Sequence, residues 1–199
     1  MTASFLSAIV VALLMAVGQQ SEGKTSNIEN TLAGFTVGVS TLDDAQKRFS
    51  DKLIIDQGRN AVRWDGQCEL FLDVEEGNYP SNAKRIVNIQ LLNLGGGQAA
   101  NSPCQSLSTG KGIRLSDSLD RVLHVYGQPT GRSVIHGALA IGYDNTGGLC
   151  KSSAKSSDSA VVRSFGLDWS DEKKAIESIS LGVSRTSCDE FREARETAK

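Results

Sequence analysis

The chain has 199 residues, of which 39% are apolar and 22% are charged, and its formal net charge is -2. This size and composition are ordinary for a globular protein, and one or two small domains can form without a metal or added cross-links. Lysine and arginine are scattered singly, so the chain lacks the basic face that a nucleic-acid backbone requires. We therefore expect no nucleic acid among its partners.

The N-terminal segment 1–18 is typical of an export signal. Residues 3–18 carry no charge, and their length is that of a signal-peptide core rather than the roughly 20 residues of a membrane span. Small residues at Ala16 and Gly18 predict a mature start at Gln19. No Lys or Arg precedes Lys24, and an uncleaved anchor is the alternative. Removal of the signal leaves a secreted or periplasmic protein without a membrane span.

Residues 19–31 are polar and show no apolar period, so we expect a disordered lead-in. The next segment has apolar residues at helical spacing, namely Leu42, Ala45 and Phe49. Ser40 with Asp43, or Thr41 with Asp44, has the form of an N-terminal cap. A short helix is therefore predicted here.

Three strand-like segments follow this helix: 61–65, 68–74 and 86–94. In the second, one face carries Cys68, Leu70, Leu72 and Val74. In the third, one face carries Val87, Ile89 and Leu91. This alternation predicts an antiparallel sheet with one buried face. A stretch rich in Gly and Ser then predicts a linker over residues 96–111.

The same order of elements recurs after the linker. One stripe of a second helix carries Leu119, Val122, Leu123 and Tyr126. Asp117 or Ser118 can cap this helix, Gly127 can end it, and Pro129 blocks its extension. Three further strands are predicted at 139–143, 160–169 and 176–183.

We therefore predict an α+β protein of two similar repeats, each a short helix packed on a three- or four-stranded antiparallel sheet. The first module covers residues 32–95, and the second covers residues 112–199 with a C-terminal tail. Alignment of the two helices superposes Phe49 on Tyr126, and a shift of two residues then aligns Trp64 with Tyr143.

Export favours disulfides between the four cysteines. The chain has no CxxC pair and no Cys-His cluster, so we expect no metal site. In the aligned repeats, Cys68 and Cys150 lie near the start of a second strand, and Cys104 and Cys188 lie just after a third. The repeat alignment therefore predicts the pairs Cys68–Cys104 and Cys150–Cys188.

Two segments resemble a known family. IRLSDSLDRVLHVYGQPT, and more loosely TVGVSTLDDAQKRFSD, are similar to the start of modules in the superfamily that includes the β-lactamase inhibitor protein and the SmpA/OmlA outer-membrane assembly lipoproteins. Ser116 stands where that family usually has Gly before the helix, and the first copy lacks the closing Pro. The resemblance implies a tandem helix-on-sheet protein that binds other proteins through one sheet face, and it implies no catalytic residue.

The residues that could carry chemistry do not form a catalytic pattern. His124 is expected on the surface of the second helix and His136 lies before a strand, without a recognisable nucleophile for either. Asp168, with Asp171 and Glu172, is interpreted as a charged turn between strands. No cofactor is expected, because the chain has no phosphate-binding or calcium-binding loop pattern.

Aromatic residues on predicted strands are the candidate binding residues: Trp64, Phe71, Tyr143 and Trp169. Phe71 shares its side of the strand with Glu69 and Asp73 and is the clearest candidate for an exposed aromatic ring. The alternative is that these residues belong to the core.

We expect a non-enzymatic binding module that acts on another exported or envelope protein, as an inhibitor or an assembly factor. Two alternatives stay open. One is an exported hydrolase that uses His136 or an acidic loop, and the other is a carbohydrate-binding module that uses the strand aromatics.

Overall fold

The computed structural model describes residues 29–56, 58–76, 83–95, 99–135, 138–144 and 159–187. The first half contains β1 (Thr31–Leu32), β2 (Phe35–Thr36), α1 (Leu42–Phe49), β3 (Leu53–Asp56), β4 (Arg59–Trp64), β5 (Cys68–Glu76) and β6 (Lys84–Asn93). The second half contains the 3-10 helix η1 (Pro103–Ser106), α2 (Leu119–Tyr126), β7 (Gly131–Ile135), β8 (Ala138–Asp144), β9 (Ser159–Ser170) and β10 (Ala175–Ser187).

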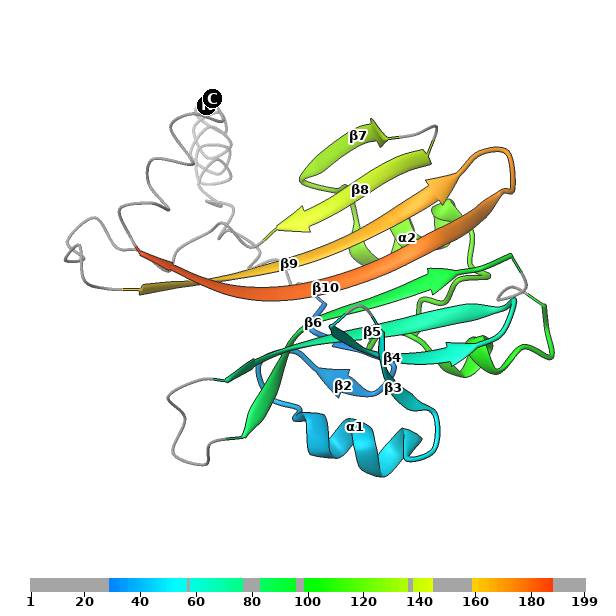
Figure 1. The fold of residues 1–199 in the computed structure, drawn as a ribbon. Coiled ribbons are helices and arrows are strands. Elements are labelled where there is room, and N and C mark those ends of the chain that lie inside the picture. Colours follow the sequence, from blue (N-terminus) through cyan, green and yellow to red (C-terminus); the bar gives the residue numbers. More distant parts are fainter. Residues whose placement is uncertain are drawn as a thin grey trace, which may run out of the picture.

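Eight strands form one antiparallel sheet in the order β3-β4-β5-β6-β10-β9-β8-β7, and β1 and β2 form a separate hairpin (Figure 1). The predicted α+β class and the antiparallel sheet are therefore confirmed. The strands of the two halves do not form separate sheets, because β6 and β10 pair in the centre and join them.

Both helices lie where the sequence predicts them. The Thr41 hydroxyl accepts a hydrogen bond from the Asp44 N–H at 3.3 Å, and the Asp44 carboxylate accepts one from the Thr41 N–H at 2.9 Å. This reciprocal arrangement is a capping box for α1. Ser118 caps α2 by accepting a bond from the Arg121 N–H at 3.2 Å. Gly127 ends α2 with a φ of 79°, which favours glycine.

The two helices and the β1–β2 hairpin pack on the same side of the sheet, which we call the inner face. Phe49 of α1 packs edge-on against Trp64 of β4, with 5.8 Å between ring centroids. Tyr126 of α2 packs against Phe165 of β9 at 4.5 Å and against Tyr143 of β8 at 5.6 Å. The fully buried side chains of the predicted apolar face of β5 are Cys68, Leu70 and Leu72.

One predicted register in β6 is wrong. Consecutive residues of β5 pair with Asn88 and Ile86, which leaves Val87 in a bulge. A bulge adds one residue to a strand and shifts the alternation of side chains beyond it. Ile86 is therefore the buried residue where we had expected Val87, while Ile89 and Leu91 are buried as predicted.

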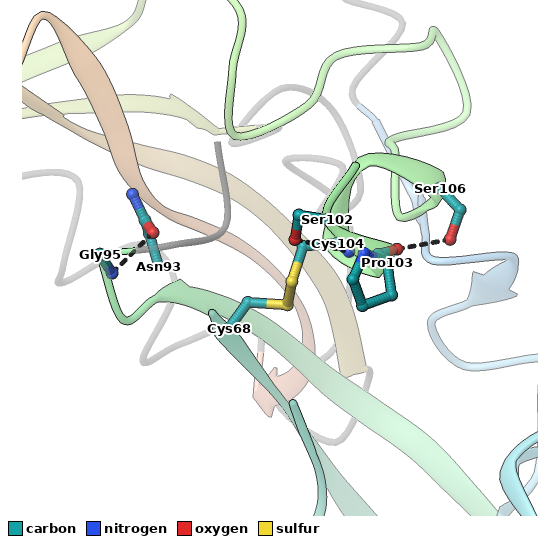
Figure 2. The surroundings of a disulfide bond; sticks show 7 residues. All are labelled: Cys68, Asn93, Gly95, Ser102, Pro103, Cys104 and Ser106. Atoms are coloured by element: carbon teal, nitrogen blue, oxygen red, sulfur yellow. Dashed lines mark hydrogen bonds between the residues drawn. A yellow bond between two sulfur atoms is a disulfide. The ribbon is translucent and has the colours of Figure 1, made fainter. Parts of the chain in front are cut away.

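Part of the segment assigned to the linker packs into the core on the inner face. Cys104 and Leu107 are buried. Cys104 forms a disulfide with Cys68 at the start of β5, as Figure 2 shows, so the predicted first bridge is confirmed. Cys150 and Cys188, the predicted second pair, lie outside the described residues.

Glu29 joins β1, residue Lys111 and α2 by hydrogen bonds. Its buried carboxylate accepts hydrogen bonds from the N–H groups of Thr31 and Lys111, both at 2.9 Å, and from the Tyr126 hydroxyl at 2.8 Å. Burial raises the pKa of Tyr126, so its hydroxyl stays protonated as the donor. Glu29 and Thr31 fall within the expected lead-in 19–31, but the structure places Thr31 in β1. The predicted signal 1–18 lies outside the described residues.

Candidate binding face

The side of the sheet opposite the helices, which we call the outer face, is covered by no other element among the residues that the structure describes (Figure 1). Strand pairing defines one row of outer-face residues across the sheet: Ala61, Phe71, Gln90, Ser180, Gly166, Gly142 and Gly131. Large and charged side chains occupy the β4–β6 end, and small side chains occupy the β7–β10 end.

At the β4–β6 end of the outer face, the Phe71 ring lies under the ion pair of Arg59 and Asp73. The Arg59 guanidinium carbon is 4.4 Å from the centroid of the Phe71 ring. The same guanidinium donates to both carboxylate oxygens of Asp73, at 2.6 and 2.9 Å. Asn88 also donates to Asp73 at 2.8 Å. The half-buried Phe71 ring is therefore held in place by a planar cation that is itself fixed by two hydrogen bonds.

The ionisation of Asp73 follows from these contacts. Burial raises the pKa of its carboxyl, but the hydrogen bonds from Arg59 and Asn88 together outweigh burial and leave the pKa below its usual value. Asp73 is therefore ionised at neutral pH, and its charge is matched by Arg59.

A second ion-pair cluster lies beside the first. Arg63 donates to Glu69 at 2.6 Å and to Asp56 at 2.8 Å. Hydrogen bonding to Glu69, which is only 7% exposed, is the main cause that raises the pKa of Arg63. Every charge in these two clusters is therefore paired, and the three carboxylates against two guanidinium groups leave one net negative charge on the polar surface beside Phe71.

At the other end, the outer face is hollowed into a groove of about 380 Å³. Its lining includes Gly131, Ser133, Ala140, Gly142, Gly166 and Asp168. Asp168 brings a carboxylate to the groove, and this carboxylate accepts a hydrogen bond from the Ser178 hydroxyl at 2.5 Å. Asp168 is thus a strand residue of β9 rather than the turn residue that we predicted, and the turn follows it.

Two glycines of the groove have no evident reason within the chain to be glycine. Neither Gly131 nor Gly142 has a positive φ. A Cβ atom at Gly131 would meet nothing within 4 Å, and one at Gly142 would meet only the Gly131 carbonyl oxygen at 4.0 Å. Glycine weakens a strand interior and often marks a place where another backbone or a ligand approaches closely.

The structure does not bring the four predicted aromatic residues together. Phe71 lies on the outer face, whereas Trp64, Tyr143 and Trp169 lie on the inner face among core residues. Tyr143 and Trp169 are each 6% exposed. His124 is exposed on α2, and His136 lies outside the described residues. The binding role of Phe71 stays a prediction.

The groove was missed at the sequence level, although glycines within strand-like alternation were a usable signal. In the described part of the chain, no three His, Cys, Asp or Glu side chains are grouped so that they could hold a metal ion. No helix there is both long enough and apolar enough to cross a membrane.

Comparison with known proteins does not assign the chain to a family: no family model, no curated protein and no solved structure matches it.

Proposed function

We propose that this protein is a non-enzymatic binding module that docks another exported or envelope protein on the outer face of its sheet. The observation that carries the proposal is the groove on this face, which no other element of the described residues covers. Its floor contains glycines that neither backbone conformation nor internal packing requires, and a strand keeps such residues at a cost in stability.

The two ends of the outer face suit different parts of one partner. The groove allows a partner backbone or a flat side chain to come close to the strands. The Phe71 ring, held by Arg59, offers a preorganised aromatic contact that loses little entropy on binding. The surrounding ion pairs are already satisfied, so they contribute to complementarity more than to affinity.

We also infer that the two halves are structural repeats. Each half contains an α-helix followed by four strands of the large sheet, and the strand order is mirrored about the β6–β10 pair. In the sequence alignment of the repeats, Phe49 matches Tyr126 and Trp64 matches Tyr143. The contacts support this match, because Phe49 packs on Trp64 at 5.8 Å and Tyr126 packs on Tyr143 at 5.6 Å. Each helix thus places its last aromatic residue on the second strand of its own half.

Photocrosslinking tests the docking face. A photoreactive residue at Gln90, Ser133 or Ser180 on the outer face is expected to capture the same exported or envelope protein. The same residue at Gln46 or Lys47, both exposed on α1, is expected to capture none of it. Equal capture from α1, or no common product from the three outer-face positions, would contradict the proposal.

Affinity measured with the captured partner then tests the surface itself. Phe71→Ala and Ser180→Arg, which fills the groove, are each expected to weaken binding by about tenfold or more. Lys47→Ala is the matched control and is expected to leave binding unchanged. Circular dichroism of each variant establishes that the fold is intact.

A further inference from the structure

The outer-face groove holds a carboxylate that has no cation beside it in the described part of the chain. Asp168 lines the groove, and its Oδ2 atom accepts a hydrogen bond from the Ser178 hydroxyl. Among the described residues, its Oδ1 atom receives no hydrogen bond, and no Lys or Arg forms an ion pair with either oxygen. A cation brought by a ligand would therefore find its counter-charge in the groove.

The other carboxylates of the outer face are paired. Asp73 binds Arg59 through both of its oxygens, and the carboxylates of Glu69 and Asp56 share the guanidinium of Arg63. With the Asp168 carboxylate, these groups set four carboxylates against two guanidinium groups. This part of the outer face is therefore complementary in charge to a cationic group of a partner.

Arg132 also borders the groove, but its charge is directed elsewhere. It pairs in register with Ile141, which is buried on the inner face. Residues opposite each other in a strand pair share a face, so the Arg132 side chain starts from the inner side. Its guanidinium donates to the Gln128 side chain, just after α2, at 2.7 Å. Asp168 is thus left for a cation from outside.

The floor of the groove is made of very small residues. Strand pairing places Ser133, Ala140 and Asp168 in one row across three strands, so the hydroxyl and the carboxylate stand two strand spacings, about 10 Å, apart. The neighbouring row consists of glycines: Gly131, Gly142 and Gly166. Between these two polar side chains the floor therefore has no side chain larger than a methyl group, and peptide groups are open to a flat ligand.

A guanidinium group fits this surface better than an ammonium group. It is planar and weakly hydrated, so it can lie flat on peptide groups, whereas an ammonium is compact and strongly hydrated. Its parallel N–H groups can also bind a carboxylate with two hydrogen bonds. The chain has this arrangement on the same face, where Arg59 binds Asp73 while its guanidinium carbon lies 4.4 Å from the centroid of the Phe71 ring.

We propose that the groove receives an arginine side chain of the docked protein. The guanidinium pairs with the Asp168 carboxylate and lies on the glycine floor. This inference rests on the proposed function, because it names the chemical group by which the partner enters the groove.

An NMR titration of the ¹⁵N-labelled chain with a capped tripeptide, acetyl-Gly-Arg-Gly-amide, tests the site directly. Saturable shifts are expected for the amide signals of Gly131, Gly142 and Asp168. The tripeptide with citrulline, which has nearly the shape of arginine without its charge, is expected to bind about tenfold or more weakly. The lysine tripeptide is also expected to bind more weakly than the arginine one. Equal binding of the arginine and citrulline peptides, or no saturable shift in the groove, overturns the proposal.

A variant of the carboxylate tests its role. Asp168→Asn removes the charge and keeps an oxygen that can accept the Ser178 hydrogen bond, so the fold is expected to stay intact, which circular dichroism checks. This variant should bind the arginine tripeptide about tenfold or more weakly. Asp65→Asn, in an exposed turn, is the matched control and should change nothing. Full affinity of a folded Asp168→Asn variant overturns the proposal.

The same variants separate this inference from the proposed function. If the partner captured on the outer face loses affinity for Ser180→Arg but binds Asp168→Asn as tightly as the unmodified chain, the docking face stands and the arginine site is wrong. If no common partner is captured, the docking function is wrong, and the tripeptide titration still decides whether the groove binds arginine.

Discussion

At the residue scale, Asp73 and its partners on the outer face make a small part of the protein's stability depend on pH. The folded-state pKa of Asp73 is lowered, so the carboxylate stabilises the fold above the unfolded pKa of about 3.9. This contribution is lost as the pH falls through the folded pKa. The effect is small, because 34% of the Asp73 side chain is exposed to solvent.

Asp73→Asn is therefore expected to lower the free energy of unfolding at pH 7 by no more than about 1 kcal/mol. The difference from the unmodified protein should shrink as the pH falls below about 4, where the carboxylate becomes protonated. Urea denaturation at both pH values measures this. Asp65→Asn, in an exposed turn, is the control, and a loss at Asp65 equal to that at Asp73 would exclude the role of the hydrogen bonds.

Gly142 permits a sharper residue-level test, because alanine meets no obstacle there. Gly142→Ala is expected to raise the free energy of unfolding by about 0.5–1 kcal/mol, since alanine is the better strand residue. The same substitution should weaken partner binding. Gly166→Ala is the contrasting variant. It is not expected to gain stability in the same way, because its Cβ would lie 3.0 Å from the Ser180 hydroxyl oxygen. Urea denaturation measures the stability of each variant, and its affinity for the partner measures binding. A Gly142→Ala variant that is more stable and binds the partner with full affinity would contradict the proposal that the partner docks in the groove.

At the element scale, the helices could be predicted from the sequence, whereas the edge strands and the register of β6 could not. The helices carry their own caps, Thr41 and Ser118, so their starts can be located from the sequence. The edge strands β3 and β7 were missed, because an edge strand lacks the one-sided apolar alternation of a strand paired on both sides. The buried register of β6 was also missed at Val87, because a bulge depends on pairing with β5 and leaves no local signal.

The candidate site likewise has one part that could be predicted from the sequence and one part that could not. Phe71 could be assigned to the outer face because its neighbours Leu70 and Leu72 alternate with it. The strand glycines were a usable signal for close approach, but the groove itself could not be located from the sequence, since it depends on strands β7, β8 and β9 being neighbours in register. The alternation over 160–169 already placed Asp168 in a predicted strand, but its charge was grouped with the turn residues Asp171 and Glu172. Only the pairing of β9 with β8 and β10 brings its carboxylate to the groove.

The disulfide is the element-scale feature with the largest expected effect on stability. It joins β5 to η1 across a sequence separation of 36 residues. Replacement of Cys68 and Cys104 together by serine is expected to lower the free energy of unfolding by about 2–4 kcal/mol, because the unfolded chain gains freedom. Urea denaturation of the oxidised proteins measures the loss. An unchanged midpoint would mean that contacts of Leu107 and its neighbours hold this segment without the bridge.

At the scale of the whole molecule, the central pair β6–β10 decides whether the two halves are independent. Leu91 pairs with Ile179 and Ile89 pairs with Leu181 across this pair, and all four side chains are fully buried. A boundary between separate domains usually carries fewer buried apolar contacts. The buried pair therefore predicts that both halves unfold as one cooperative unit.

The chain's two tryptophans, Trp64 and Trp169, lie one in each half and can report on them separately. Each of the variants Trp64→Phe and Trp169→Phe keeps one tryptophan, so its fluorescence reports on one half. Each variant is expected to show a single urea transition. The midpoint of that transition should agree with the midpoint that circular dichroism gives for the same variant. Leu181→Ala should lower both midpoints together, at a cost of about 2–5 kcal/mol. If the transition reported by Trp169 moved and the one reported by Trp64 did not, the two halves would fold separately. In a cooperative sheet, the loss of a central side chain destabilises both halves together.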